Sequence, residues 1–252
     1  SPKKSQTPEG ISSFVIKKLK DVLLPLLCKF FNKSFLLGEV PKEWRHAVVS
    51  PLNKKPPRTS IFNYRPISLT SSFCKLFELV IKRKITLYLQ TNNILSVNQF
   101  GFLKGRNTTS QLLLCITEWL SAKESDEQVD CVYIDFAKAF DVVNHRFLIH
   151  KLRNYGISNN MLRWIDSYLS DRTFQVKYLS TLSNVYPCVS GVPQGSVLGP
   201  LLFLVYINDI EKCSLGHSTI VIYDDDVKIS RIMHSSDPVA AWVNFQKKNI
   251  GI

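Results

Sequence analysis

Three consecutive aspartates, Asp224–Asp226, stand between two short apolar segments, and this feature constrains the fold more than any other. The segments Thr219–Tyr223 and Val227–Ile232 are rich in β-branched residues, which predicts two strands joined by a tight turn. Carboxylates this close are costly unless water or cations neutralise them. One explanation of the pattern is an acidic turn exposed to solvent, because aspartate favours turns. The other explanation is a pair of divalent cations, roughly 3.5–4 Å apart, of the kind that serves phosphoryl transfer.

A second acidic position strengthens the case for a metal site. Asp135 ends another strand-like segment, Val129–Phe136, which is rich in β-branched and aromatic residues. Magnesium prefers oxygen ligands, mainly carboxylates, substrate phosphates and water. From these residues alone, both the solvated turn and the metal site stay open.

The rest of the chain mixes helices and strands. Apolar residues at helical spacing predict helices at 11–37, 68–91, 108–122, 145–155, 158–169 and 196–209, and another from about residue 237. Pro25 is expected to kink or divide the first helix, and Ser68 or Thr70 to cap the second. Further strands are predicted at 47–52, 174–179 and 184–189, the last two as a hairpin. This order indicates an α+β fold with antiparallel strands.

Charge is spread unevenly along the chain. The net charge is +12, from 32 basic and 20 acidic residues. Residues 1–106 hold 19 Lys and Arg against 5 Asp and Glu, whereas residues 107–252 hold 13 against 15. A basic half joined to a slightly acidic half is typical of a polyanion-binding surface beside a cation site, although a solvated charged face gives the same balance.

Other features indicate an intracellular protein, in the nucleus or cytoplasm, with no membrane partner. The six cysteines are scattered and form no CxxC pair, which favours reduced thiols. The longest apolar run, 197–207, is too short to span a bilayer, and residues 1–10 do not resemble a signal peptide. Three tryptophans are expected in the core rather than as base-stacking platforms: Trp44, Trp119 and Trp164.

Five motifs occur in order along the chain. They are NYRPISL at 63–69, QFGF with KGR at 99–106, YIDFAKAFD at 133–141, GVPQGSVLGPLLF at 191–203 and YDDD at 223–226. Together they resemble the motifs of reverse transcriptases from non-long-terminal-repeat (LINE-type, jockey-like) retrotransposons. The resemblance implies a right-hand polymerase fold, with fingers-like helical and basic residues 1–128, a partial palm with an antiparallel sheet at 129–252, and no thumb.

The same resemblance implies two-metal transfer of a deoxynucleotide to a primer 3′-hydroxyl on an RNA template. The partners would be the RNA template, the DNA primer and deoxynucleoside triphosphates. Asp135, Asp225 and Asp226 would be catalytic and would hold two Mg²⁺ ions, or Mn²⁺, together with the backbone carbonyl of Phe136.

Further site residues follow from the motifs. Phe140 matches the aromatic residue that excludes a 2′-hydroxyl, although a core phenylalanine is the alternative. Lys104 and Arg106 would touch the template, with a solvated loop as the alternative. The remaining substrate contacts implied are Lys54, Arg65, Phe136, Gln194, Gly195 and Tyr223.

The chain also departs from the family pattern. Position 224 usually carries Ala, Met or Val, so Asp224 adds a third carboxylate that is expected to weaken nucleotide binding or change the metal preference. The thumb and an endonuclease domain are missing, and PEGI at 8–11 replaces PDGI, which suggests a truncated, decayed copy. One alternative function is therefore a catalytically dead RNA-binding fragment. Another is a metal-dependent nuclease, which Phe140 and the Gln194–Gly195 loop disfavour.

Overall fold

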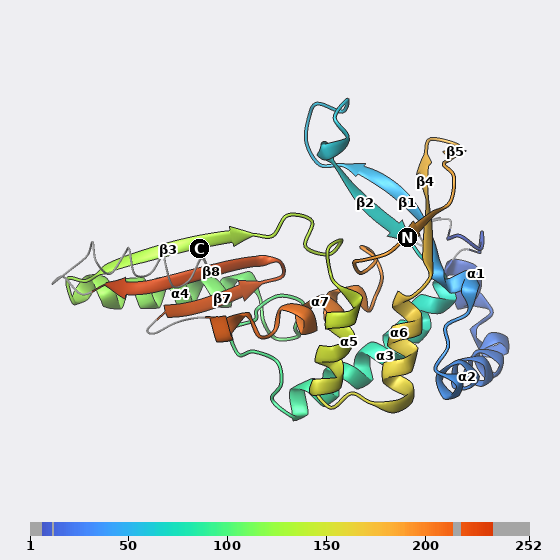
Figure 1. The fold of residues 1–252 in the computed structure, drawn as a ribbon, viewed down its shortest axis with the longest axis horizontal. Coiled ribbons are helices and arrows are strands. Elements are labelled where there is room, and N and C mark those ends of the chain that lie inside the picture. The colour runs from blue at the N-terminus through green and yellow to red at the C-terminus, as the bar shows by residue number, and fades with distance from the viewer. Residues whose placement is uncertain (1–6, 12, 214–217, 234–252) are drawn as a thin grey trace. The chain divides into compact units, whose positions relative to one another are not determined.

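The computed structural model describes residues 7–11, 13–213 and 218–233 (Figure 1). The chain forms two compact units, and each combines two separate segments: 1–92 with 140–205, and 93–139 with 206–252. The predicted division into fingers (1–128) and palm (129–252) stays a prediction. The helix expected from residue 237 lies outside the described residues.

The first unit contains a five-stranded sheet in the order β2-β1-β4-β5, with β6 also paired to β4. Its strands are β1 (His46–Asn53), β2 (Tyr64–Leu69), β4 (Arg172–Tyr178), β5 (Thr181–Leu182) and β6 (Tyr186–Cys188). β1 runs antiparallel to β2 and parallel to β4, and β6 runs antiparallel to β4. The antiparallel β4–β6 pair confirms the predicted hairpin.

The helices of the first unit supply its core. They are α1 (Ser13–Lys18), α2 (Lys20–Leu37), α3 (Ser72–Thr91), α5 (His145–Asn154), α6 (Asn159–Leu169) and most of α7 (Gly199–Ile207), with short 3-10 turns η1 (Lys42–Arg45) and η2 (Ile61–Asn63). Phe77 of α3 stacks on Phe31 of α2 and meets Trp164 of α6 edge to face, with ring centroids 4.6 and 5.0 Å apart. Trp164 and Trp44 are buried, as predicted.

Two predicted helix boundaries were wrong. The first helical region is divided at Leu19, between α1 and α2, and Pro25 lies inside α2. The second region begins at Ser72, where the Ser71 hydroxyl accepts a hydrogen bond from the Cys74 amide. Residues 64–69 cannot join this helix because they pair with β1, so Ser68 and Thr70 are not its caps.

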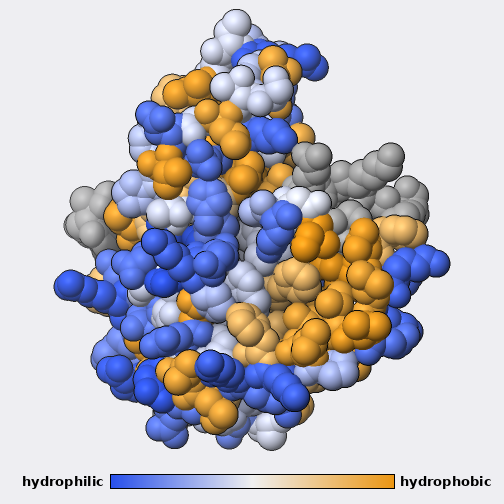
Figure 2. All heavy atoms as spheres, turned by 90° about the vertical axis from the view of Figure 1, so that its right-hand side faces the viewer, coloured by the Kyte–Doolittle hydropathy of each residue, from blue (hydrophilic) through white to orange (hydrophobic). Residues whose placement is uncertain are grey.

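Apolar side chains also gather on a surface of the molecule (Figure 2). Exposed apolar residues of the first unit include several from α1, from α2 and from the position between them: Phe14, Val15, Leu19, Val22, Leu26, Phe30 and Leu37. Contiguous apolar surface of this kind is typical of contact sites.

The second unit is built on a three-stranded antiparallel sheet in the order β3-β8-β7. Its elements are α4 (Thr108–Glu124), β3 (Gln128–Asp135), η3 (Ile210–Cys213), β7 (Ser218–Tyr223) and β8 (Asp226–Met233). Asn107 caps α4 in a capping box with Ser110. Glu118 fastens α4 to the sheet, because its carboxylate accepts hydrogen bonds from Thr219 on β7 (2.7 Å) and Ser230 on β8 (2.9 Å).

The structure can be compared with two expectations from the sequence, one about the cysteines and one about membrane-spanning segments. All six cysteine thiols are free, and Cys74 and Cys115 are buried. Among the described residues, no helix combines the length and apolar character needed to cross a membrane.

Candidate active site

The register of the second unit's sheet places Asp135 directly opposite Asp226. β7 and β8 pair with Tyr223 opposite Asp226, which leaves Asp224 and Asp225 as a two-residue turn. β3 pairs with the other side of β8, with Asp135 opposite Asp226. Directly opposed residues have Cβ atoms roughly 4.5–5.5 Å apart and side chains on one face. Two of the predicted metal ligands are therefore neighbours, and the third, Asp225, lies in the adjoining turn.

Burial and the charges of neighbouring carboxylates both act on Asp224 in this turn. The pKa of Asp224 is raised from 3.8 to about 6, first by burial and then by the negative charges of Asp225 and Asp226. Asp224 also adopts a positive φ of 55°, which aspartate tolerates better than most residues. Burial and the charges of Asp225 and Asp226 thus disfavour ionisation of the Asp224 carboxyl group.

The carboxylates fit a divalent cation only in part. Asp135 and Asp226 are both exposed, and they offer the oxygen ligands that magnesium prefers. Magnesium commonly takes one or two carboxylates and completes its shell with substrate phosphates and water. Within the described part of the chain, no group of three or more His, Cys, Asp or Glu is placed to hold a metal. The residues therefore fit an ion shared with a substrate, rather than an all-protein cage.

The QFGF motif holds the aspartate turn in place. Residues 98–100 run beside β7, because the Ile222 amide donates to the Asn98 carbonyl (2.9 Å) and the Phe100 amide donates to the Ile222 carbonyl (2.8 Å). A Cβ atom on Gly101 would lie 2.3 Å from the Asp224 backbone nitrogen. Only glycine therefore allows this loop to approach the turn so closely.

Arg106, predicted to touch the template, makes structural contacts in the same loop. Its guanidinium donates to the carbonyls of Ser96 (3.2 Å), Val97 and Gln99 (2.7 Å). It also lies over the Phe100 ring, 5.6 Å from the centroid. These bonds anchor the loop before α4. Lys104 is exposed, and template contact by either residue stays a prediction.

Phe136 and Tyr223 belong to the second unit, whereas the other predicted substrate residues lie in the first unit. The side-chain amide of Gln194 donates to Asp141 Oδ1 (2.9 Å), and the Ser68 amide donates to the Gln194 carbonyl (2.8 Å). Gly195 has φ +101°, and a Cβ atom there would lie 2.9 Å from the Ser68 carbonyl oxygen. Three motifs that are distant in the sequence, at 63–69, 133–141 and 191–203, thus meet at this loop.

Phe140 packs within the first unit. Its ring stacks on the buried Phe203, with centroids 4.6 Å apart, and its carbonyl accepts a hydrogen bond from the Val192 amide (2.8 Å). These contacts agree with the alternative that Phe140 is a core phenylalanine. A role in excluding ribonucleotides stays a prediction.

Lys54 and Arg65 lie on the β1–β2 hairpin. Arg65 pairs with Leu52, and the Lys54 amide donates to the Asn63 carbonyl (2.7 Å) just beyond the paired strands. Both side chains are exposed. The hairpin can therefore present two cations to an anionic ligand, and contact of either residue with a triphosphate stays a prediction.

Glu78 of α3 was not predicted, yet it supports the Gln194–Gly195 loop. Its fully buried carboxylate accepts hydrogen bonds from the amides of Val197 and Leu198, both at 2.8 Å, just before α7. The sequence contains one signal for it, an acidic residue on the apolar face of a helix. That signal alone does not identify the partner.

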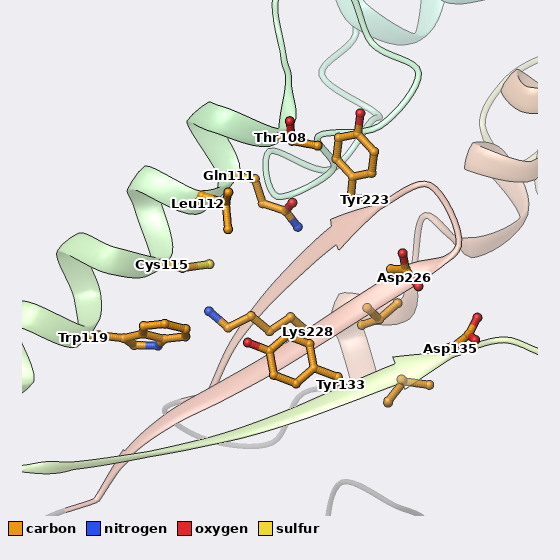
Figure 3. A pocket seen from close by; sticks show the side chains of 12 residues that line it. Thr108, Gln111, Leu112, Cys115, Trp119, Tyr133, Asp135, Tyr223, Asp226 and Lys228 are labelled. Carbon is orange, nitrogen blue, oxygen red and sulfur yellow. The ribbon is translucent and has the colours of Figure 1, made fainter.

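A pocket of about 430 Å³, also not predicted, lies between α4 and the sheet of the second unit (Figure 3). Trp119 and Cys115 of α4 face Lys228 of β8, and Tyr133 of β3 lies beside the lysine (Figure 3). Asp135 and Asp226 also line this pocket. Trp119 is only partly buried, so its prediction as a core residue was wrong; its ring lines the pocket wall.

Comparisons with known proteins agree with this arrangement. Residues 52–237 match the model of the family described as reverse transcriptase (RNA-dependent DNA polymerase). The chain is 32% identical over 235 residues to a probable RNA-directed DNA polymerase from transposon X-element of Drosophila melanogaster. It is also 32% identical over 210 residues to the RNA-directed DNA polymerase from mobile element jockey of the same species. These alignments cover 91% and 82% of this chain, but only 26% and 23% of the relatives.

Solved structures support the fold. Telomerase of Candida tropicalis, without its C-terminal domain, aligns with a TM-score of 0.56 at 13% identity, over 83% of this chain and 49% of that one. The mixed α and β architecture is thus that of a polymerase, and the predicted resemblance to reverse transcriptases of non-long-terminal-repeat retrotransposons is confirmed. Since the family model covers most of the chain, this protein belongs to the reverse transcriptase (RNA-dependent DNA polymerase) family.

Proposed function

We propose that this chain contains the polymerising centre of an RNA-directed DNA polymerase, which adds deoxynucleotides to a primer 3′-hydroxyl on an RNA template. The observation that carries the proposal is the register of β3 and β8, which sets Asp135 opposite Asp226 beside the turn residue Asp225. In this proposal the sheet β3-β8-β7 belongs to the palm.

The three aspartates would hold divalent ions, Mg²⁺ or Mn²⁺. Bound ions of this kind lower the pKa of an attacking hydroxyl and stabilise charge on the leaving phosphate. The protein itself contributes by holding these carboxylates in position. The two opposed strands fix Asp135 and Asp226, while the close approach of Gly101 fixes the turn that carries Asp225.

The first unit would bind the incoming nucleotide. Arg65 and Lys54 offer cations that suit phosphate, and arginine can bind it through two parallel hydrogen bonds. Asp141 accepts a hydrogen bond from the Gln194 side chain, and Ser68 donates one to the Gln194 carbonyl, so Gln194 is held in place before a substrate arrives. Gly195 lies close against Ser68. Phe140 would lie beside the sugar, supported by Phe203.

The test is primer extension on an RNA template, with labelled deoxynucleotides, in Mg²⁺ and separately in Mn²⁺. The double variant Asp225→Asn with Asp226→Asn, and Asp135→Asn alone, should abolish extension. Asp126→Asn is the matched control, because Asp126 is an exposed aspartate of the same unit with a positive φ that asparagine tolerates. Extension that survives in Asp135→Asn would contradict the proposal. No extension by the parent, together with salt-sensitive RNA binding, would favour the inactive RNA-binding fragment.

A further inference from the structure

A buried lysine distinguishes the pocket between α4 and the sheet from an ordinary packing gap. Lys228 is 6% exposed, and among the described residues its Nζ has no hydrogen-bond partner. The ammonium lies 4.2 Å from the centroid of the Trp119 ring. A tryptophan face attracts a cation but accepts no conventional hydrogen bond from it. The three N–H donors of Lys228 therefore lack the acceptors that a buried ammonium needs.

The walls of the pocket favour a flat apolar body. Leu112, Cys115 and Trp119 line it from α4, and Tyr133 and Val227 line it from the sheet. Its volume of about 430 Å³ lies within the range of small-molecule sites, which combine apolar walls with a few polar groups. Aromatic walls stack well against an aromatic ligand.

The charged residues that line the pocket indicate which net charge a ligand should carry. Within the described part of the chain, Lys228 is the only basic residue that lines it, whereas Asp135 and Asp226 contribute two carboxylates. A polyphosphate would bring several negative charges close to those carboxylates, and the single ammonium of Lys228 could neutralise only one of them. One acidic group, placed at Lys228 and away from the aspartates, satisfies the lysine without that repulsion.

We propose that this pocket binds an aromatic monoanion, whose acidic group accepts hydrogen bonds from Lys228 while its ring packs between Trp119 and Tyr133. Tyr133 lies beside the lysine in Figure 3 and is 70% exposed, so its side chain can turn to admit the ligand with little loss of packing. All residues that line the pocket belong to the second unit, and Asp135 and Asp226 are shared with the candidate active site. Binding in the pocket does not depend on polymerase activity.

The proposal is tested by calorimetric titration of the metal-free protein with 2-naphthoate and with its neutral counterpart 2-naphthamide. The parent should bind the carboxylate roughly ten- to a hundredfold more tightly, as expected for hydrogen bonds to a charged group. Lys228→Met should remove this preference and leave weak, equal binding of both compounds. Lys123→Gln is the matched control, because Lys123 is an exposed lysine of α4, and it should bind like the parent.

Three results would overturn the proposal: no saturable binding of 2-naphthoate to the parent, equal binding of the two compounds, or a preference that persists in Lys228→Met. Urea unfolding of each variant checks that it is folded. If Lys228→Met does not fold, Lys228→Gln takes its place, since it keeps a polar group of similar length but removes the charge. A preference retained in Lys228→Gln counts against the proposal in the same way.

Discussion

The buried carboxylate of Glu78 gives the sharpest prediction about stability. Glu78→Ala removes the shared acceptor of the Val197 and Leu198 amides, and nothing in the smaller side chain can replace it. An unsatisfied buried donor costs roughly 1–3 kcal/mol, so two of them should lower the free energy of unfolding by roughly 2–6 kcal/mol. Glu78→Gln keeps one oxygen that can accept both bonds, without the charge. It should therefore lose less stability than Glu78→Ala.

Urea unfolding measures these losses, and hydrogen exchange at the Val197 and Leu198 amides shows whether they arise at the predicted place. Protection of these two amides should fall in Glu78→Ala more than protection elsewhere in α7. Glu43→Ala is the control, because Glu43 is exposed and should change the unfolding free energy by less than about 0.5 kcal/mol. A loss below about 1 kcal/mol in Glu78→Ala, or equal losses in the Ala and Gln variants, would refute the reasoning.

Three further predictions concern the second unit. Gly101→Ala places a methyl group 2.3 Å from the Asp224 nitrogen, so it should shift the turn and lower the midpoint of thermal unfolding; an unchanged midpoint would show that the loop yields freely. Asp224 binds its proton more tightly in the folded state, so its contribution to stability falls as pH rises from about 4 to about 6. Asp224→Asn should therefore gain stability relative to the parent between pH 4.5 and pH 7 in urea titrations, and a constant difference would contradict the raised pKa. Lys228→Met replaces an unsatisfied buried ammonium and should raise the free energy of unfolding by roughly 1–4 kcal/mol, whereas a loss would show that the lysine is well satisfied.

Sequence patterns predicted the local features of the candidate site. The strands on either side of Asp224–Asp226 and the strand that ends at Asp135 follow from short-range alternation and composition, and the structure has all three. Their register does not follow from such patterns. That Asp135 faces Asp226 depends on pairing between segments about 90 residues apart, which no local property specifies.

The missed features depend on contacts between distant segments. Residues 64–69 contain a proline and no clear alternation, and they form β2 because β1 provides a partner. Lys228 lies in an apolar strand, and its burial becomes visible only when α4 covers that face of the sheet. The two compact units could not be predicted either, because each combines segments separated by long stretches of sequence.

The backbone of Asp224 bears on how its charge should be tested. This residue has φ 55°, a conformation that asparagine adopts readily and alanine much less so. Asp224→Ala would therefore remove a charge and strain the turn in one step, and a change in nucleotide incorporation could not be assigned to either cause. Asp224→Asn removes the charge alone. If the third carboxylate weakens nucleotide binding, Asp224→Asn should lower the Michaelis constant for deoxynucleotides while Asp126→Asn leaves it unchanged; equal constants in the parent and Asp224→Asn would show that the neighbouring aspartates or bound cations already offset this charge.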